Sequence, residues 1–178
     1  MAAWPLRLAF LAIGQPAVVA QITRSTSNAR WADASRPSAG QFLRQGQSLE
    51  ISRGRVVATL ASGAQIGVVA PAKFCIEDDN VVRLDSGRLS GVAPSQATAF
   101  AVETTAGRVV DLGTQFVLSK DADHVIRLWV FEGLVEIQPP SLAGGNPFRV
   151  SESQGVRFDA RTGEATRTSF DGVEMLVP

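Results

Sequence analysis

The sequence predicts an all-β fold, and three observations lead to this prediction. From Ala17 onward, no stretch of ten residues repeats apolar positions at intervals of three and four, the spacing that a core-facing helix requires. Short segments rich in Val, Ile, Leu and Phe follow one another instead. Turn sequences separate them about every 8 to 12 residues, which is typical of sandwiches, rolls and barrels.

The expected strands are four to eight residues long, and several alternate apolar with polar residues. Glycine-containing turns such as SRGR, DSGR and FEG lie between them, because glycine adopts a positive φ without a Cβ clash. In chain order the strands are 17–23, 48–52, 55–61, 64–70, 81–85, 88–92, 99–104, 108–113, 115–119, 124–131, 134–138, 148–152 and 155–160. Three segments repeat the order strand, glycine turn, strand and proline. The fold could therefore be a short solenoid-like arrangement as well as a sandwich or roll.

Length and composition indicate one globular domain. A chain of 178 residues is too short for two ordinary domains with a linker, and 45% hydrophobic residues suffice for a core. Lys plus Arg and Asp plus Glu both number 17, so no overall charge attracts nucleic acid or an anionic membrane. The arginines between Arg24 and Arg55 are scattered in the sequence, and we interpret them as a solvated surface.

The N-terminal segment is distinct from the rest. Residues 1–20 carry one charge, Arg7, before an apolar run from Leu8 to Ile13 that is too short for the roughly 20 residues of a membrane span. The segment fits a weak signal peptide, part of a longer transmembrane helix, or a short helix packed on the domain. We therefore divide the chain into residues 1–20 and a β domain at 21–178.

No catalytic, cofactor-binding or metal-binding constellation is predicted. His124 is the only histidine, and we interpret it as a polar residue at the start of a strand. Cys75, the only cysteine, excludes an internal disulfide and is expected to pack as a small hydrophobe. The acidic clusters at 77–80 and 120–124 lack the length and closure of a calcium loop, and we expect solvated turns.

The stretch VVDLGTQFVL at 109–118 resembles the start of an active site but has a simpler interpretation. Asp111 and Thr114 flank Gly113 between two apolar runs, which predicts a strand, a kink or bulge, and a second strand. Side chains of these types bond the backbone groups that such a break releases from the ladder. We therefore expect Asp111 and Thr114 to hold a bend rather than to perform chemistry.

An ordered series of motifs resembles the FecR domain of bacterial transmembrane signalling regulators, in the version found in planctomycete-like bacteria. The combination of DLGTQF with VFEGLVEI about fifteen residues later is specific to that family. The series consists of ARWAD at 29–33, the glycine-rich run at 46–74, LDSGRLSGVAP at 84–94, AFAVETTAGRVVDLGTQFVLS at 99–119, VFEGLVEI at 130–137 and FDGVEMLVP at 170–178. The family-motif residues carried over are Asp111, Leu112, Gly113, Thr114, Phe116, Phe131, Glu132 and Gly133, which we interpret as structural.

The resemblance implies a non-enzymatic extracytoplasmic sensor or regulatory domain without a cofactor. In the family, such domains act on an extracytoplasmic-function sigma factor across the inner membrane, so the expected partner is a membrane or outer-membrane signalling protein. Nucleic acid is not an expected partner, and the expected location is periplasmic, attached to the inner membrane. The chain departs from the family pattern at Gln115, where a Glu is usual, at Val117 and at Ala70.

A second function class remains open, namely a carbohydrate- or ligand-binding β-sandwich at the cell surface. Such a module requires exposed aromatic platforms. Trp4 lies in the N-terminal segment and Trp129 is expected to be buried, which leaves Trp31 with Phe148 as a weak companion. An enzyme would need an active site assembled from scattered carboxylates, and no pair of them is distinguished.

Overall fold

The prediction of a single all-β domain is confirmed. The structure, a computed structural model, describes residues 16–93, 100–122, 124–140 and 146–169, without the side chains of 121 and 122. These ranges contain strands and no helix. The strands are β1 (Val18–Ser25), β2 (Arg30–Trp31), β3 (Phe42–Arg44), β4 (Ser48–Arg53), β5 (Arg55–Leu60), β6 (Gln65–Asp78), β7 (Val81–Val92), β8 (Ala101–Thr104), β9 (Gly107–Asp111), β10 (Gln115–Ala122), β11 (Val125–Glu132), β12 (Leu134–Gln138), β13 (Phe148–Ser151), β14 (Gln154–Asp159) and β15 (Glu164–Arg167).

The long hairpin of β6 and β7 is shared by two sheets. The two strands pair from Gln65 opposite Val92 to Asp78 opposite Val81, with a break in register between Val69 and Lys73. On one side of that break the hairpin pairs with β5 and β10, and on the other side with β4 and β8. All fifteen strands are hydrogen-bonded into one sheet, which folds at this break into two parts. We call the part β3-β1-β5-β6-β7-β10-β11-β14-β15 the first sheet and the part β2-β4-β6-β7-β8-β9-β12-β13 the second sheet.

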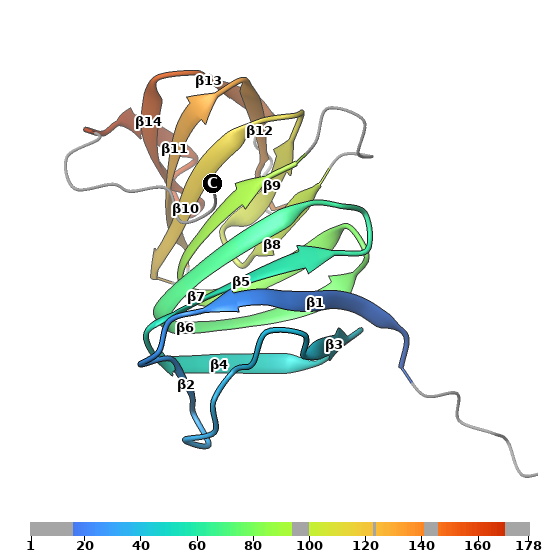
Figure 1. Cartoon of the computed structure of the whole chain (residues 1–178). Coiled ribbons are helices and arrows are strands. Elements are labelled where there is room, and N and C mark those ends of the chain that lie inside the picture. Colours follow the sequence, from blue (N-terminus) through green and yellow to red (C-terminus); the bar gives the residue numbers. More distant parts are fainter. Residues whose placement is uncertain (1–15, 94–99, 123, 141–145, 170–178) are drawn as a thin grey trace, which may run out of the picture.

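The two sheets pack face to face on one hydrophobic core. Ring pairs join them: Phe100 and Phe116 have centroids 6.2 Å apart, and Phe148 and Phe158 have centroids 5.3 Å apart. One cluster of buried side chains draws on both sheets. In Figure 1 the green hairpin lies between the blue strands of the N-terminal half and the yellow to orange strands of the C-terminal half. The arrangement corresponds to the sandwich or roll alternative and not to a solenoid.

The bend in the hairpin corrects two sequence predictions. We expected a strand to end at Ala70 and DSGR to form a turn, but β6 continues through Pro71 and β7 continues through Gly87. Proline has no N–H for the ladder, and the register of β6 and β7 breaks at this point. Gly87 has φ of +98°, and a Cβ there would lie 2.5 Å from the Pro71 carbonyl oxygen. Both strands therefore bend together instead of ending.

The remaining differences concern short strands and the N-terminus. β2 and β3 have two and three residues, and every residue of β15 is exposed, so none of the three carries a clear apolar pattern. β1 begins at Val18, and its residues Val19 and Ala20 are buried in the core. The last three residues of the segment 1–20 thus belong to the first sheet, while the helix considered for that segment lies outside the described residues.

Replacement of Gly87 tests the bend. We expect Gly87→Ala to lower the free energy of unfolding by about 3 kcal/mol or more, because the methyl group meets backbone and side-chain atoms of Pro71 and Ala72 in addition to the cost of positive φ. Gly40→Ala is the matched control, since Gly40 has φ of +88° with open space around it, and should cost about 1 kcal/mol. Equal costs in urea titrations would show that the close approach at Gly87 has no energetic effect.

Candidate functional site

The family-motif residues lie where the chain passes twice between the two sheets. Residues 111–114 lead from β9 in the second sheet to β10 in the first, and residues 132–134 lead from β11 back to β12. The two crossings are adjacent, because Gln115 pairs with Glu132 and Asp111 pairs with Val135. We call this place the double crossing. The structure brings the two halves of the motif together in space.

Glycines allow the two crossings to approach each other closely. Gly113 has φ of +91° and Gly133 has φ of +83°, a region that side chains rarely adopt. A Cβ on Gly133 would lie 2.7 Å from Cγ2 of Thr114 and 2.9 Å from the carbonyl oxygen of Gly113. Leu112 is half-exposed between them, and its N–H donates to the Leu134 carbonyl at 3.3 Å.

Asp111 is the buried polar centre of the double crossing. Its side chain and that of Thr114 are almost completely buried. Its Oδ1 accepts hydrogen bonds from the Gly113 N–H at 2.9 Å and from the Thr114 hydroxyl. Its Oδ2 accepts no hydrogen bond from the described residues. Burial raises the pKa of Asp111, and the hydrogen bonds from Thr114 and Gly113 only partly oppose that rise.

The surroundings of Asp111 favour a structural role. Acid-base catalysis requires a second group that exchanges a proton with the carboxyl or with a substrate. Both hydrogen bonds to Oδ1 come from the crossing itself. Phe116, two residues after Thr114, is fully buried. Glu132 is exposed and accepts a hydrogen bond from Gln115 Nε2 at 2.9 Å. Phe131 is half-buried. The hydrogen bonds of Asp111 hold the bend between β9 and β10. We propose this structural role for the motif residues.

Substitution at Asp111 tests this role. We expect Asp111→Ala to lower the free energy of unfolding by about 1–3 kcal/mol, because the Gly113 N–H and the Thr114 hydroxyl lose a buried acceptor. Because the pKa is raised on folding, this carboxyl contributes most below its unfolded value of 3.8, and the contribution falls as pH rises through the folded value. Urea titrations should therefore show a larger cost of Asp111→Ala at pH 4 than at pH 8. A cost that does not change with pH would contradict the account.

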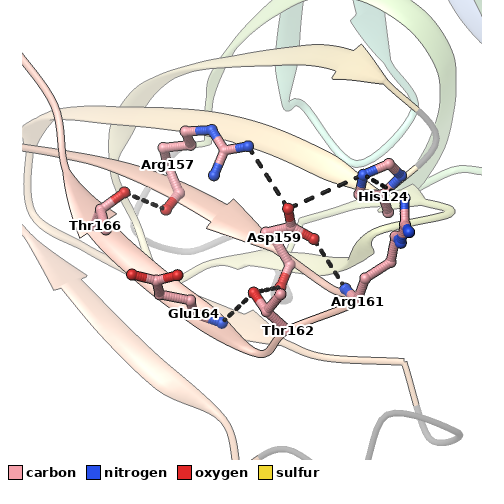
Figure 2. Close-up of polar contacts among 7 residues, drawn as sticks. All are labelled: His124, Arg157, Asp159, Arg161, Thr162, Glu164 and Thr166. Atoms are coloured by element: carbon pink, nitrogen blue, oxygen red, sulfur yellow. Dashed lines mark hydrogen bonds and ion pairs between the residues drawn. The ribbon is translucent and has the colours of Figure 1, made fainter.

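His124 belongs to a polar cluster at the β14–β15 hairpin, shown in Figure 2. Its Nε2 lies 4.0 Å from Oδ2 of Asp159 and 3.4 Å from an Arg161 guanidinium nitrogen. Asp159 also pairs with Arg157 at 3.6 Å and accepts the Arg161 N–H at 3.0 Å. The sequence analysis found no partner for His124, because Asp159 lies 35 residues away in the chain and only the pairing of β11 with β14 brings it near.

Asp159 contributes a pH-dependent stability. Burial raises the pKa of Asp159, but the Arg161 N–H and the charges of His124, Arg157 and Arg161 outweigh it and leave the pKa below 3.8. A lowered carboxyl pKa stabilises the fold above the unfolded value, and that stability is lost as pH falls through the folded value. We expect Asp159→Asn to lower the melting temperature at pH 7 and to have no effect at pH 2. If Asp159→Asn lowered the melting temperature equally at pH 7 and at pH 2, the loss would be due to packing and not to charge.

The other titratable candidates do not form a reactive site. Cys75 is buried, and burial raises the pKa of its thiol, with the charge of Glu77 acting in the same direction. Glu77 instead pairs with Arg83 at the end of the β6–β7 hairpin. Within the described residues, no three His, Cys, Asp or Glu side chains converge as a metal site. The described ranges also contain no helix long and apolar enough to cross a membrane.

The aromatic platform of the carbohydrate-binding hypothesis is not formed by Trp31. This side chain is only 7% exposed, although its edge reaches a polar depression of about 340 Å³ that also contains Asp33 and Glu50. Phe148 lies on β13 and packs against Phe158. Trp129 is buried as expected, and its Nε1 donates to the Ser169 carbonyl at 2.6 Å. Trp4 lies outside the described residues.

Four arginines that are far apart in the sequence align across the first sheet. On its outer face one register row runs through β5, β6, β7, β10, β11 and β14, and four of its six members are arginines. The row consists of Arg55, Val69, Arg88, Ser119, Arg127 and Arg157. Neighbouring residues such as Val68, Leu89 and Leu118 point into the core, so the row faces outward. The sequence does not reveal this row, because the register between distant strands is not visible in it.

Comparison with known proteins supports the resemblance found in the sequence. Residues 53–136 match the model of the family described as FecR protein, and this range contains the whole double crossing. Two crystal structures of a candidate anti-sigma factor from Parabacteroides distasonis have the same fold, with a TM-score of 0.56 and 17% identity. The match covers 68% of this chain and 59% of that protein. No curated protein sequence matches the chain.

Proposed function

We propose that the chain is a non-enzymatic, extracytoplasmic regulatory module of a sigma-factor pathway, because residues 53–136 match the model of the family described as FecR protein. Its role is to bind a signalling protein and to transmit the resulting signal toward an extracytoplasmic-function sigma factor. The family match is the observation that carries this proposal. The fold shared with the Parabacteroides protein is consistent with it.

The site geometry supports binding rather than catalysis. The family-motif residues are committed to the double crossing, where Asp111 bonds its own loop. The polar cluster around Asp159 is held by ion pairs and backbone bonds of its own hairpin. A regulatory domain of this kind acts through its surfaces, and its periplasmic position and attachment to the inner membrane are part of the proposal.

Strand β15 is the best-placed sheet edge for a protein partner. It pairs only with β14 among the described strands, and all four of its residues are exposed. An edge strand presents unpaired N–H and C=O groups, to which a strand from another protein can add. Thr168 N–H points inward to the Gly155 carbonyl at 2.9 Å, so by the alternation of antiparallel ladders the Ala165 N–H points outward.

Affinity capture with the full chain tests this function. We expect recovery of a membrane or outer-membrane component of a sigma-factor system, identified by mass spectrometry. Ala165→Pro should reduce capture at least about tenfold, because it removes an outward N–H, whereas Ala165→Val keeps that group and should capture normally. Capture that is unchanged in Ala165→Pro would exclude this edge. Glycan binding without any captured signalling protein would favour the carbohydrate-binding hypothesis.

A further inference from the structure

Three arginines lie on neighbouring strands of the outer face of the first sheet. Arg55 on β5 and Arg88 on β7 belong to one register row, two strands apart, which corresponds to about 10 Å. Arg24 on β1 pairs with Val57 and is therefore diagonal to Arg55, at about 7–8 Å between the backbones. We call Arg24, Arg55 and Arg88 the arginine face.

The arginine face has no neutralising carboxylate among the described residues. None of the described ion pairs involves one of its three members. The strands β1 and β5 contain no acidic residue. The acidic residue of β7, Asp85, accepts a hydrogen bond from Arg83 at 3.0 Å. The net charge of zero thus conceals a local positive charge that is available to an anion.

A depression at the arginine face also presents hydroxyl groups. It has a volume of about 270 Å³ and is lined by Arg24, Ser25, Thr26, Arg55 and Val57. The Ser25 hydroxyl donates to the Pro37 carbonyl at 2.9 Å. The Thr26 hydroxyl donates to Asn28 Oδ1 at 2.7 Å and accepts the Arg55 N–H at 3.0 Å. Each hydroxyl oxygen therefore keeps a lone pair for a ligand, beside cations that attract an anionic group.

The arginine face lacks the apolar side chains on which other ligands depend. The large apolar side chains that are exposed in the described ranges are Val18, Phe42 and Leu112. Val18 and Phe42 lie toward the other end of β1 from Arg24, and Leu112 lies at the double crossing. Protein interfaces have an aromatic or aliphatic centre, and single-stranded nucleic acid stacks its bases on aromatic rings. Neither kind of contact is available here.

Strand addition is also excluded at this place. At the arginine face, β5 pairs with β1 and β6, and β7 pairs with β6 and β10. Their backbone groups are therefore used within the sheet, and a ligand meets side chains alone. Recognition at this face depends on charge and on hydroxyl groups.

We propose that the arginine face binds a linear acidic polysaccharide, which carries both carboxylates and hydroxyl groups. A guanidinium fork binds a carboxylate through two parallel hydrogen bonds, and all three cations of the face are arginines. Hydroxyls of the same sugar find acceptors at Ser25 and Thr26. A polyanion that binds through ion pairs releases its counterions and needs no apolar contact.

The spacing of the arginines fits a polymer of this class. When every second sugar of an extended chain is a uronic acid, successive carboxylates recur at an interval similar to that between Arg55 and Arg88. Arg127 continues the same row two strands beyond Arg88, so the row is long enough for several sugars. An extended peptide places side chains of one face about 7 Å apart, which matches this spacing less well. The inference adds a ligand to the domain and does not rest on the proposed function.

Binding of hyaluronan oligosaccharides to the full chain tests the inference, because they carry a carboxylate on every second sugar. We expect the triple variant Arg24→Gln, Arg55→Gln and Arg88→Gln to bind at least about tenfold more weakly, since three exposed ion pairs are lost. Its affinity should also depend less steeply on salt concentration. A chain that does not bind hyaluronan at low salt would overturn the inference.

A second triple variant controls for net charge. Arg108→Gln, Arg149→Gln and Arg167→Gln removes the same charge from exposed residues elsewhere on the molecule. It should bind hyaluronan like the unchanged chain. Equal losses in the two triple variants would mean nonspecific attraction and would overturn the inference.

Other polymers decide the class of ligand. We expect hyaluronan to bind more tightly than poly-L-glutamate or a DNA duplex at equal charge concentration, and neutral dextran not to bind. Tighter binding of poly-L-glutamate would assign the arginine face to an acidic protein, and tighter binding of DNA would assign it to nucleic acid; either result contradicts the inference. The arginine-face variant should still capture a sigma-system partner, so failure of this inference and failure of the proposed function are distinguishable.

Discussion

The bent hairpin of β6 and β7 is the constraint on which the rest of the structure depends. Each half of the hairpin pairs with a different set of strands, so β6 and β7 belong to both sheets. Proline at position 71 and the approach of Gly87 to its carbonyl allow both strands to bend at the same level. Once the hairpin is bent, the two sheets face each other, and later strands must cross between them. The double crossing at Asp111 and Gly133 satisfies this requirement at the far end of the shared core.

The sequence predicted the strands better than their connections. Alternating apolar residues located most strands, and the Gly113 break was correctly placed between β9 and β10. Pro71 was misread as an end, because in a single strand proline usually stops pairing, and only the matching bend at Gly87 makes continuation possible. The arginine row and the contact of His124 with Asp159 depend on register between distant strands, which local patterns do not encode.

The polar groups inside the molecule and those on its surface have different roles in this architecture. Asp111, Thr114 and Phe116 of the motif are buried, and Asp111 bonds the chain as it changes sheets. We propose that partners bind at the surface, where strand β15 pairs only with β14 among the described strands.

Native-state hydrogen exchange of the β6–β7 hairpin tests the central claim most directly. If one bent hairpin unites both sheets, its amides on both sides of Pro71 and Gly87 exchange only through global unfolding, with a single free energy and a single dependence on urea. The residues to compare are Ile66 and Leu89 in the first sheet with Phe74 and Leu84 in the second, all of which are buried. A lower opening free energy for the pair in one sheet would show that the sheets unfold separately, and would contradict the account.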